Sequence, residues 1–266
     1  MKVVIFAGGL GTRMREETEF KPKPMVEIGG IPILVHLIEI FARQGFTDII
    51  VLAGYKAQYI KSYFSNFLVN LSDISLTLSE AGQEVTYQPQ QSGMVATFSK
   101  GLRVSVLDTG EETLTGERLM MVQEQIGNQG FLATYGDGLA SVNLKDLIMR
   151  HQQGKKMATL TVTRPSNRFG IVDLNEGGTV QGFREKPAMT DYVNMGFFVF
   201  EPSVFDLLRP NESLEEGLLT RLASQSELTA YTYDGFWQPM DTYREYEYLN
   251  SLWKDGSPLW RVPDGD

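Results

Sequence analysis

Cysteine is absent from the 266 residues of the chain, and histidine occurs only at His36 and His151. The lack of cysteine excludes disulfides, thiolate nucleophiles and cysteine-ligated zinc. Two histidines are too few for a histidine-rich metal site. His36 lies in an apolar helical pattern and His151 in a polar segment, which favours structural or solvated roles. Any bound metal ion must therefore be held by oxygen ligands.

Long apolar runs are missing as well. A membrane-spanning helix needs about eighteen or more consecutive apolar residues, and the chain has no such stretch. From Lys2 the sequence passes through a short apolar stretch to Gly8, without the pattern of a signal peptide. We therefore expect a cytoplasmic protein with no membrane partner.

Positive charge is in deficit, with 24 Lys and Arg against 33 Asp and Glu and a net charge of −9. A nucleic-acid partner is excluded on this ground, since no domain-wide basic surface is available to neutralise a phosphate backbone. Small anionic substrates remain compatible with the sequence, provided that a few cations gather locally. The 42% of hydrophobic residues is ample for a substantial core.

The first half of the chain alternates apolar strand patterns with helical ones. Val3–Ala7 is a continuous apolar run, typical of a strand that is buried on both faces. Ile33–Arg43 has helical spacing, Asp48–Ala53 is a second strand pattern, Lys56–Phe64 is again helical, and Phe131–Tyr135 is another strand. This order predicts an α/β, Rossmann-like fold with a mixed, mostly parallel sheet flanked by helices.

The second half adds closely spaced strand patterns, which predict further antiparallel strands: Ala158–Thr163, Ile171–Leu174, Thr179–Phe183 and Val193–Phe200. Ser213–Ser224 and Tyr243–Trp253 predict a helical C-terminal end. Without a linker or repeat, we expect one domain over residues 1–266. Residues 80–105, rich in Gln, Ser and Gly, are compatible with a hairpin, or with a loop that covers a site or meets another subunit.

A glycine-rich turn follows the first strand: Gly8, Gly9 and Gly11, with Thr12 and Arg13 after them. Such a turn can direct backbone N–H groups at a phosphate, and an arginine can bind a phosphate with two hydrogen bonds. The spacing matches neither the dinucleotide-binding fingerprint nor a Walker loop. By itself, the turn is equally compatible with a purely structural role.

Two lysines then alternate with two prolines in the segment 21–24. Proline fixes φ and removes a donor, so the segment predicts an extended loop with Lys21 and Lys23 on the same side. An isolated segment of this kind is more often a solvated basic turn, but this one closely follows a phosphate-type turn.

Together these motifs resemble the N-terminus of the sugar-1-phosphate nucleotidyltransferases, and within that family the members that join CTP to glucose 1-phosphate. The resemblance continues along nearly the whole chain, through Gly54-Tyr55-Lys56, Asp108-Thr109-Gly110, Tyr135-Gly136-Asp137-Gly138, Arg168-Phe169-Gly170, Glu185-Lys186-Pro187, Asn194–Phe198 and Gly235–Thr242. It implies a nucleotide-binding half of about residues 1–135 and a sugar-phosphate-binding half of 136–266 that includes the C-terminal helices.

The resemblance also implies roles for individual residues. Arg13 and Lys23 would act in catalysis. Nucleotide binding would fall to Ala7, Gly8, Gly9, Gly11, Thr12, Arg13, Lys23, Thr109, Arg118 and Gly136. The sugar phosphate would be bound by Gly170, Glu185, Lys186, Asn194 and Gly196. Met195 and Glu117 depart from the pattern, since a smaller residue and a glycine are expected there.

Asp137 and Asp241 would hold Mg²⁺, the cofactor that the family implies. Asp137 comes at the carboxyl end of a predicted strand, where open α/β sheets bind ligands. Two carboxylates suit a hard octahedral cation that keeps its other positions for water and phosphate oxygens. Alone, Gly-Asp-Gly would be an ordinary turn.

The expected reaction is in-line attack of glucose 1-phosphate on the α-phosphorus of CTP, giving CDP-glucose and pyrophosphate. A different nucleotide (UTP or dTTP) or sugar phosphate is one alternative, and a catalytically inactive, sugar-nucleotide-binding regulatory protein is a second. A nicotinamide oxidoreductase is disfavoured by the glycine spacing. The family resemblance further implies a closed homo-oligomer.

Overall fold

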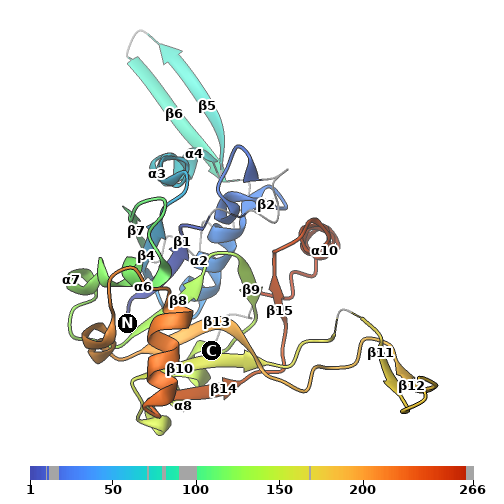
Figure 1. The fold of residues 1–266 in the computed structure, drawn as a ribbon. Helices are drawn as coiled ribbons and strands as arrows, with labels where there is room; N and C mark the ends of the chain where they lie inside the picture. The colour runs from blue at the N-terminus through green and yellow to red at the C-terminus, as the bar shows by residue number, and fades with distance from the viewer. Residues whose placement is uncertain are drawn as a thin grey trace.

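The computed structural model of the chain describes residues 1–9, 11, 18–70, 72–79, 82–89, 101–167 and 169–261. Two residues expected to bind nucleotide, Thr12 and Arg13, lie outside these ranges. Within them, a seven-stranded sheet forms the centre of the molecule, in the order β14-β10-β13-β8-β1-β4-β7 (Figure 1). Its strands are β1 (Val3–Ala7), β4 (Asp48–Ala53), β7 (Arg103–Asp108), β8 (Phe131–Tyr135), β10 (Ala158–Thr163), β13 (Val193–Phe200) and β14 (Leu228–Thr232).

Only β13 runs against the other strands of this sheet, because every remaining neighbour pair is parallel. The mixed, mostly parallel sheet expected from the sequence is thus confirmed. The added antiparallel strands are confirmed as well, because β10 pairs antiparallel with β13 and β11 with β12. The parallel partner of β10, β14, was not predicted from the sequence.

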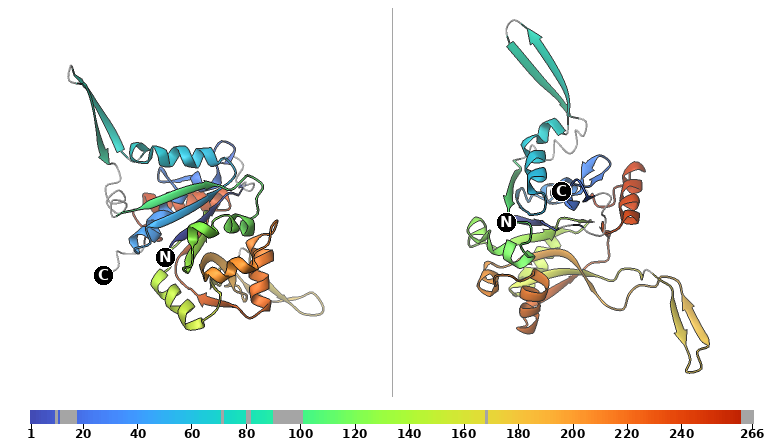
Figure 2. Two further views of the ribbon diagram at one scale, coloured as in Figure 1. Left: turned by 90° about the vertical axis from the view of Figure 1, so that its left-hand side faces the viewer. Right: turned by 45° about the horizontal axis from the view of Figure 1, so that its top comes forward.

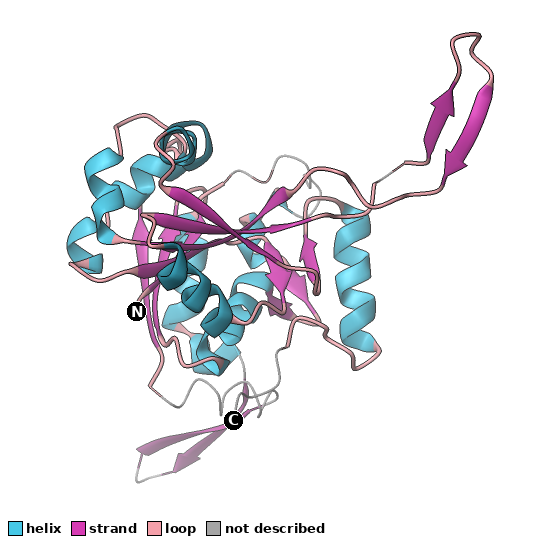
Figure 3. Ribbon diagram, turned by 90° about the horizontal axis from the view of Figure 1, so that it is seen from below, coloured by secondary structure: helices cyan, strands magenta, loops and turns pink. Residues whose placement is uncertain are grey.

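Helices cover both faces of the sheet (Figures 2 and 3). One face packs against helices α2 (Ile33–Arg43), α3 (Ala57–Ser65), α8 (Leu144–Gly154) and α10 (Tyr243–Lys254). The other packs against α6 (Thr115–Met120), α7 (Gln123–Ile126), η3 (Pro202–Leu207), η4 (Leu214–Leu219) and α9 (Thr220–Ser224). Successive residues of one strand face opposite sides, so Val3 and Ile5 lie in the first core and Val4 and Phe6 in the second.

The smaller elements are η2 (Lys23–Met25), α4 (Phe67–Asn70) and four two-stranded sheets. The sheets pair β2 (Glu27–Ile28) with β3 (Ile31–Pro32), β5 (Ser72–Ser79) with β6 (Gly82–Pro89), β9 (Gly138–Ala140) with β15 (Trp237–Pro239), and β11 (Ile171–Leu174) with β12 (Val180–Arg184). The β5–β6 and β11–β12 hairpins project from the body of the molecule (Figures 1 and 2). The sequence left residues 80–105 open between a hairpin and a loop. The β5–β6 hairpin reaches residue 89 and β7 begins at 103, whereas residues 90–100 lie outside the described ranges.

None of the helices in the described part of the chain is long and apolar enough to cross a membrane.

His36 of α2 is fully buried beneath the C-terminal segment. Its Nε2 lies 2.9 Å from the carbonyl oxygen of Ile28, and the rings of Trp253 and Trp260 meet it edge-on. Burial, with a smaller contribution from the charge of Arg261, lowers the pKa of His36 to about 4 against the opposing effect of the Ile28 carbonyl. His36 is therefore neutral in the native protein at neutral pH.

This burial predicts a loss of stability in mild acid. Between pH 6.5 and 4 the unfolded chain protonates His36 and the native chain does not, so the unfolded state gains up to about 3 kcal/mol. Urea unfolding of the wild type and of His36→Gln at several pH values measures this contribution. The free energy of unfolding of the variant should fall less steeply from pH 6.5 to 4, and parallel curves would contradict the assignment.

Candidate functional site

A concavity with a volume of about 810 Å³ opens at the carboxyl ends of β1 and β8. The strand order reverses at this point. From β1 the chain first adds β4 and β7 on one side of β1, and later adds β8 on the opposite side. Open α/β sheets bind their ligands at such a switch point. The expected phosphate-type turn at Gly8, Gly9 and Gly11 lines this cavity, as does Gly136 after β8.

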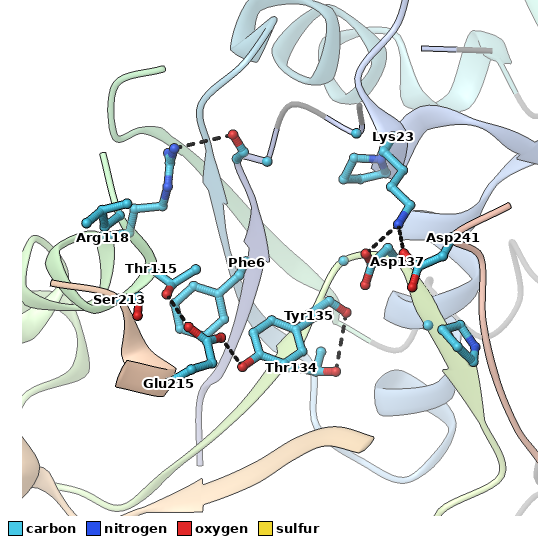
Figure 4. Close-up of a pocket in the computed structure, with 18 of the residues that line it drawn as sticks. Phe6, Lys23, Thr115, Arg118, Thr134, Tyr135, Asp137, Ser213, Glu215 and Asp241 are labelled. Carbon is cyan, nitrogen blue, oxygen red and sulfur yellow. Dashed lines mark hydrogen bonds and ion pairs between the residues drawn. The ribbon is translucent and has the colours of Figure 1, made fainter. Parts of the chain in front are cut away.

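Three charged side chains meet at one end of the cavity (Figure 4). Lys23 Nζ donates to Asp137 Oδ2 at 2.7 Å and to Asp241 Oδ1 at 2.6 Å. Burial by itself would lower the pKa of Lys23, but the two carboxylates outweigh it and raise the pKa above its ordinary value. The lysine is therefore a stable cation between two anions.

The backbone around Lys23 differs from the extended loop that the sequence suggested. Residues Lys23–Met25 form a 3₁₀ turn, in which the Met25 N–H donates to the Pro22 carbonyl at 2.8 Å. Proline favours this position because its fixed φ suits the first residues of a helical turn and its missing N–H is not needed there. As a result the two lysines separate: Lys23 is buried, whereas Lys21 pairs with Glu27 at 3.6 Å.

Asp241 reaches the site through non-local pairing. β9 begins one residue after Asp137 and pairs with β15, which ends two residues before Asp241. The Met240 N–H also donates to the carbonyl of Asp137 at 2.8 Å. A capping box at the start of α10 holds the backbone at Asp241 in place, because the Glu245 carboxylate accepts hydrogen bonds from the N–H groups of Asp241 and Thr242. Two carboxylates far apart in sequence are thus held together.

The carboxylate pair fits the magnesium ion that the family resemblance implies. Both groups are hard oxygen donors and both already direct an oxygen at one cation, the Lys23 ammonium. No cluster of three or more acidic or histidine side chains occurs among the described residues. Mg²⁺ does not require one, since it is commonly held by one or two carboxylates together with water and substrate phosphates.

Arg118 lies at the opposite end of the cavity, on α6, and bonds to protein acceptors. Its Nη2 donates to the carbonyls of Gly8 at 3.3 Å and Glu111 at 3.1 Å. Its Nη1 donates to the carbonyl of Ala53 at 3.1 Å and to the Thr109 hydroxyl. One guanidinium therefore ties the end of β4 to the segments that follow β1 and β7. Burial lowers its pKa, an effect that nearby negative charge partly offsets.

Two glycines leave room for this guanidinium. A Cβ at Gly8 or at Gly54 would lie 2.3 Å from an atom of the Arg118 side chain. Thr109 is buried and donates to the Ala53 carbonyl at 2.7 Å, and Ala7 is buried in the core behind the turn. Of the expected nucleotide-binding residues that the structure describes, Ala7 and Thr109 are therefore absent from the cavity lining, while the others contribute to it.

The expected sugar-phosphate residues are not brought together. Asn194 lines the cavity beside Met195, and Gly196 follows with a positive φ of 82° against the Tyr135 ring. Gly170, Glu185 and Lys186, however, lie on the projecting β11–β12 arm and not in the cavity lining. There Lys186 pairs with Glu185 at 3.3 Å, and more than half of each side chain is exposed.

Sequence reasoning missed an acidic group in the cavity. Glu215 accepts from the Tyr135 hydroxyl and from the Thr115 hydroxyl, the latter at 3.0 Å (Figure 4). Burial raises the pKa of Tyr135, and the Glu215 charge raises it further. Trp237 also lines the cavity. No local motif marked Glu215, because the cavity draws its lining from separate elements.

Comparisons with known proteins agree with this architecture. The family model described as nucleotidyl transferase matches residues 2–255. A glucose-1-phosphate cytidylyltransferase of Salmonella typhi is 44% identical over 265 residues, covering 98% of this chain and 99% of that protein. A probable glucose-1-phosphate cytidylyltransferase of Bacillus subtilis is 40% identical over 264 residues, covering 98% and 100%.

Among solved structures, a UDP-glucose pyrophosphorylase complexed with UDP-glucose matches with a TM-score of 0.69 at 17% identity, covering 96% of this chain and 98% of that one. At this identity the likeness concerns the fold alone. The fold and the cavity at its switch point define an α/β protein of the nucleotide-binding type. With the family model matching almost the whole chain, the protein belongs to the nucleotidyl transferase family.

Proposed function

We propose that the protein transfers the cytidylyl group of CTP to glucose 1-phosphate, forming CDP-glucose and pyrophosphate. The observation that carries the reaction type is the buried Lys23 beside the pair Asp137 and Asp241, in a cavity lined by a glycine-rich turn. The choice of CTP and glucose 1-phosphate follows the two relatives at 44% and 40% identity over nearly full length.

In the proposed reaction a phosphate oxygen of glucose 1-phosphate attacks the α-phosphorus of CTP. The bond from that phosphorus to the oxygen bridging the β-phosphorus breaks, and pyrophosphate leaves with the electron pair. The nucleophile is already anionic and requires no general base. Repulsion between two anions is the main obstacle, so catalysis consists of positioning and charge neutralisation.

Each part of the site has a task in this scheme. The N–H groups of the turn at Gly8, Gly9 and Gly11 bind triphosphate oxygens, as the resemblance implies also for Arg13. Lys23 neutralises phosphate charge. Arg118 keeps the turn in place through its carbonyl contacts. Asp137 and Asp241 would hold Mg²⁺, which supplies positive charge to the phosphates when it is bound.

The sugar phosphate would lie on the side of the cavity where Asn194 and Met195 contribute to the lining. Lys186 can contribute only if the β11–β12 arm bends toward the cavity. Burial of apolar surface would favour this movement. An isolated two-stranded hairpin cannot cover its own apolar side chains, and the arm exposes Phe169, Val172, Leu174, Val180 and Phe183.

A substitution on the arm tests this assignment. Lys186→Ala should raise KM for glucose 1-phosphate about tenfold or more and leave KM for CTP nearly unchanged, because a charge-assisted phosphate contact contributes about 1.5–3 kcal/mol. Arg184→Ala is the matched control, since Arg184 pairs with Asp173 on the same arm. Initial rates with each substrate varied in turn provide both constants. Similar changes of KM for glucose 1-phosphate in the two variants would show that Lys186 does not bind this substrate.

The test of the proposed function is pyrophosphate release with Mg²⁺ and glucose 1-phosphate, comparing CTP, UTP, dTTP, ATP and GTP. Release with CTP alone supports the proposal. Preference for another nucleotide keeps the mechanism and changes the product. Release with none of them, for glucose 1-phosphate and other sugar phosphates alike, favours a sugar-nucleotide-binding protein without catalysis.

The closed homo-oligomer and the cytoplasmic location remain predictions from the sequence. Light scattering and cell fractionation test them.

A further inference from the structure

The carboxylates proposed to hold the metal already have a cation. Lys23 Nζ lies within 2.7 Å of an oxygen of Asp137 and within 2.6 Å of an oxygen of Asp241. The Lys23 side chain is only 10% exposed, whereas those of Asp137 and Asp241 are 36% and 29% exposed. A metal ion entering the pair must compete with a charge that the protein itself supplies.

We propose that Lys23 is a resident, exchangeable cation of the metal site, which leaves Asp137 and Asp241 when a triphosphate binds and thereby admits the metal. This inference rests on the proposed function, since it assigns a metal to that carboxylate pair. It goes beyond it by making metal binding and nucleotide binding cooperative.

A triphosphate bound at the glycine-rich turn would lie next to Lys23 and could replace the two carboxylates as its partner. A Cβ at Gly11 would lie 3.0 Å from Lys23 Cβ, so the lysine stem packs directly against the glycine-rich turn, and both residues line the cavity. A triphosphate on that turn offers Lys23 a phosphate anion without moving the backbone. The flexible four-carbon stem of lysine permits such an exchange, whereas the planar fork of arginine would restrict it.

Charge balance explains why the exchange is useful. Two carboxylates this close repel each other strongly when no cation lies between them. Lys23 relieves that repulsion in the empty enzyme and leaves the pair with a net charge of about −1, a weaker attraction for a divalent ion than −2. Once Lys23 moves to the phosphates, the full charge of the pair becomes available. By linkage, metal and triphosphate each strengthen the binding of the other.

The experiment measures Mn²⁺ binding to the full chain by electron paramagnetic resonance of the free ion, without substrates. Lys23→Met removes the charge and keeps the length of the side chain, and it should bind Mn²⁺ at least tenfold more tightly than the wild type. Lys21→Met is the matched control from the same motif and should bind like the wild type. Equal or weaker binding by Lys23→Met overturns the proposal.

Two further measurements keep the test decisive. The first uses α,β-methylene-CTP, a CTP analogue that cannot release pyrophosphate. With the wild-type protein, this analogue should increase the affinity for Mn²⁺ by more than the Mn²⁺ bound to the free analogue accounts for. This coupling should shrink in Lys23→Met, and an unchanged coupling counts against the exchange even if the affinities differ. Should Lys23→Met fail to fold, judged by circular dichroism, Lys23→Gln takes its place.

Asp137→Asn separates failure of the exchange from failure of the function. It should weaken Mn²⁺ binding in the presence of the analogue. If Asp137→Asn binds Mn²⁺ as well as the wild type does, the metal is not on this pair, and both the metal assignment and the exchange are wrong. Pyrophosphate release by the wild type is measured separately, so the proposed function is tested independently of the exchange.

Discussion

Replacement of Lys23 by alanine should lower kcat about a hundredfold or more. Lys23 is buried in the cavity, bonded to both Asp137 and Asp241, and packed against the phosphate-type turn. In the proposed reaction it neutralises charge that develops on the phosphates. Loss of one preorganised group of this kind costs about 3 kcal/mol in the transition state, which corresponds to a factor of about 10².

Lys56→Ala is the comparison variant for this prediction. Lys56 precedes α3, outside the 810 Å³ cavity, and it donates to the carbonyl of Glu19. Its removal should change kcat less than threefold. Steady-state pyrophosphate release from both variants, at saturating CTP and glucose 1-phosphate, provides the numbers. Equal losses of kcat would show that Lys23 has no special part in the chemistry.

Local pattern was enough to place most elements of the sheet. The predicted ranges for β1, β4, β8, β10 and β13 agree with the structure residue for residue. These strands are buried and, apart from the three threonines of β10, largely apolar, so the pattern and the tertiary burial favour the same assignment. β14 was missed because Leu228–Thr232 alternates only weakly and its residues are no more than half-buried. β7 was missed because it follows a long polar segment.

The site could be predicted only in part, because its geometry depends on contacts between distant segments. The glycine-rich turn and Lys23 stand out in the sequence, but the pairing of β9 with β15 that brings Asp241 to Asp137 does not. Resemblance to a family supplied that assignment. Resemblance also gave Arg118 a place near the nucleotide, whereas its four contacts with protein acceptors become visible only in the structure.

The proline-rich motif illustrates the limit of local rules. Proline at residues 22 and 24 is compatible with an extended chain and equally with the start of a 3₁₀ turn. Burial of Met25 decides between them, because its side chain is 1% exposed in the core beneath the turn. The same turn carries Lys23 inward and leaves Lys21 outside. Propensity alone could not separate the two lysines.

Asp137→Asn is expected to lower kcat/KM for CTP by about a hundredfold or more and to raise the Mg²⁺ concentration needed for half-maximal rate. The amide is nearly isosteric with the carboxylate but carries no charge, so one of the two proposed metal ligands loses most of its attraction for a hard cation. Lys23 keeps its ion pair with Asp241 at 2.6 Å, and the variant should therefore stay folded.

Asp48→Asn is the matched control for this substitution, because Asp48 begins β4 at the end of the sheet away from the cavity and pairs with Arg103 at the surface. Rates measured across a Mg²⁺ titration separate two explanations. A lower rate that recovers at high Mg²⁺ identifies Asp137 as a ligand whose loss weakens binding. A low rate at every Mg²⁺ concentration, with unchanged half-saturation, instead assigns Asp137 to the positioning of Lys23, because the ammonium then has a single carboxylate to hold it in place.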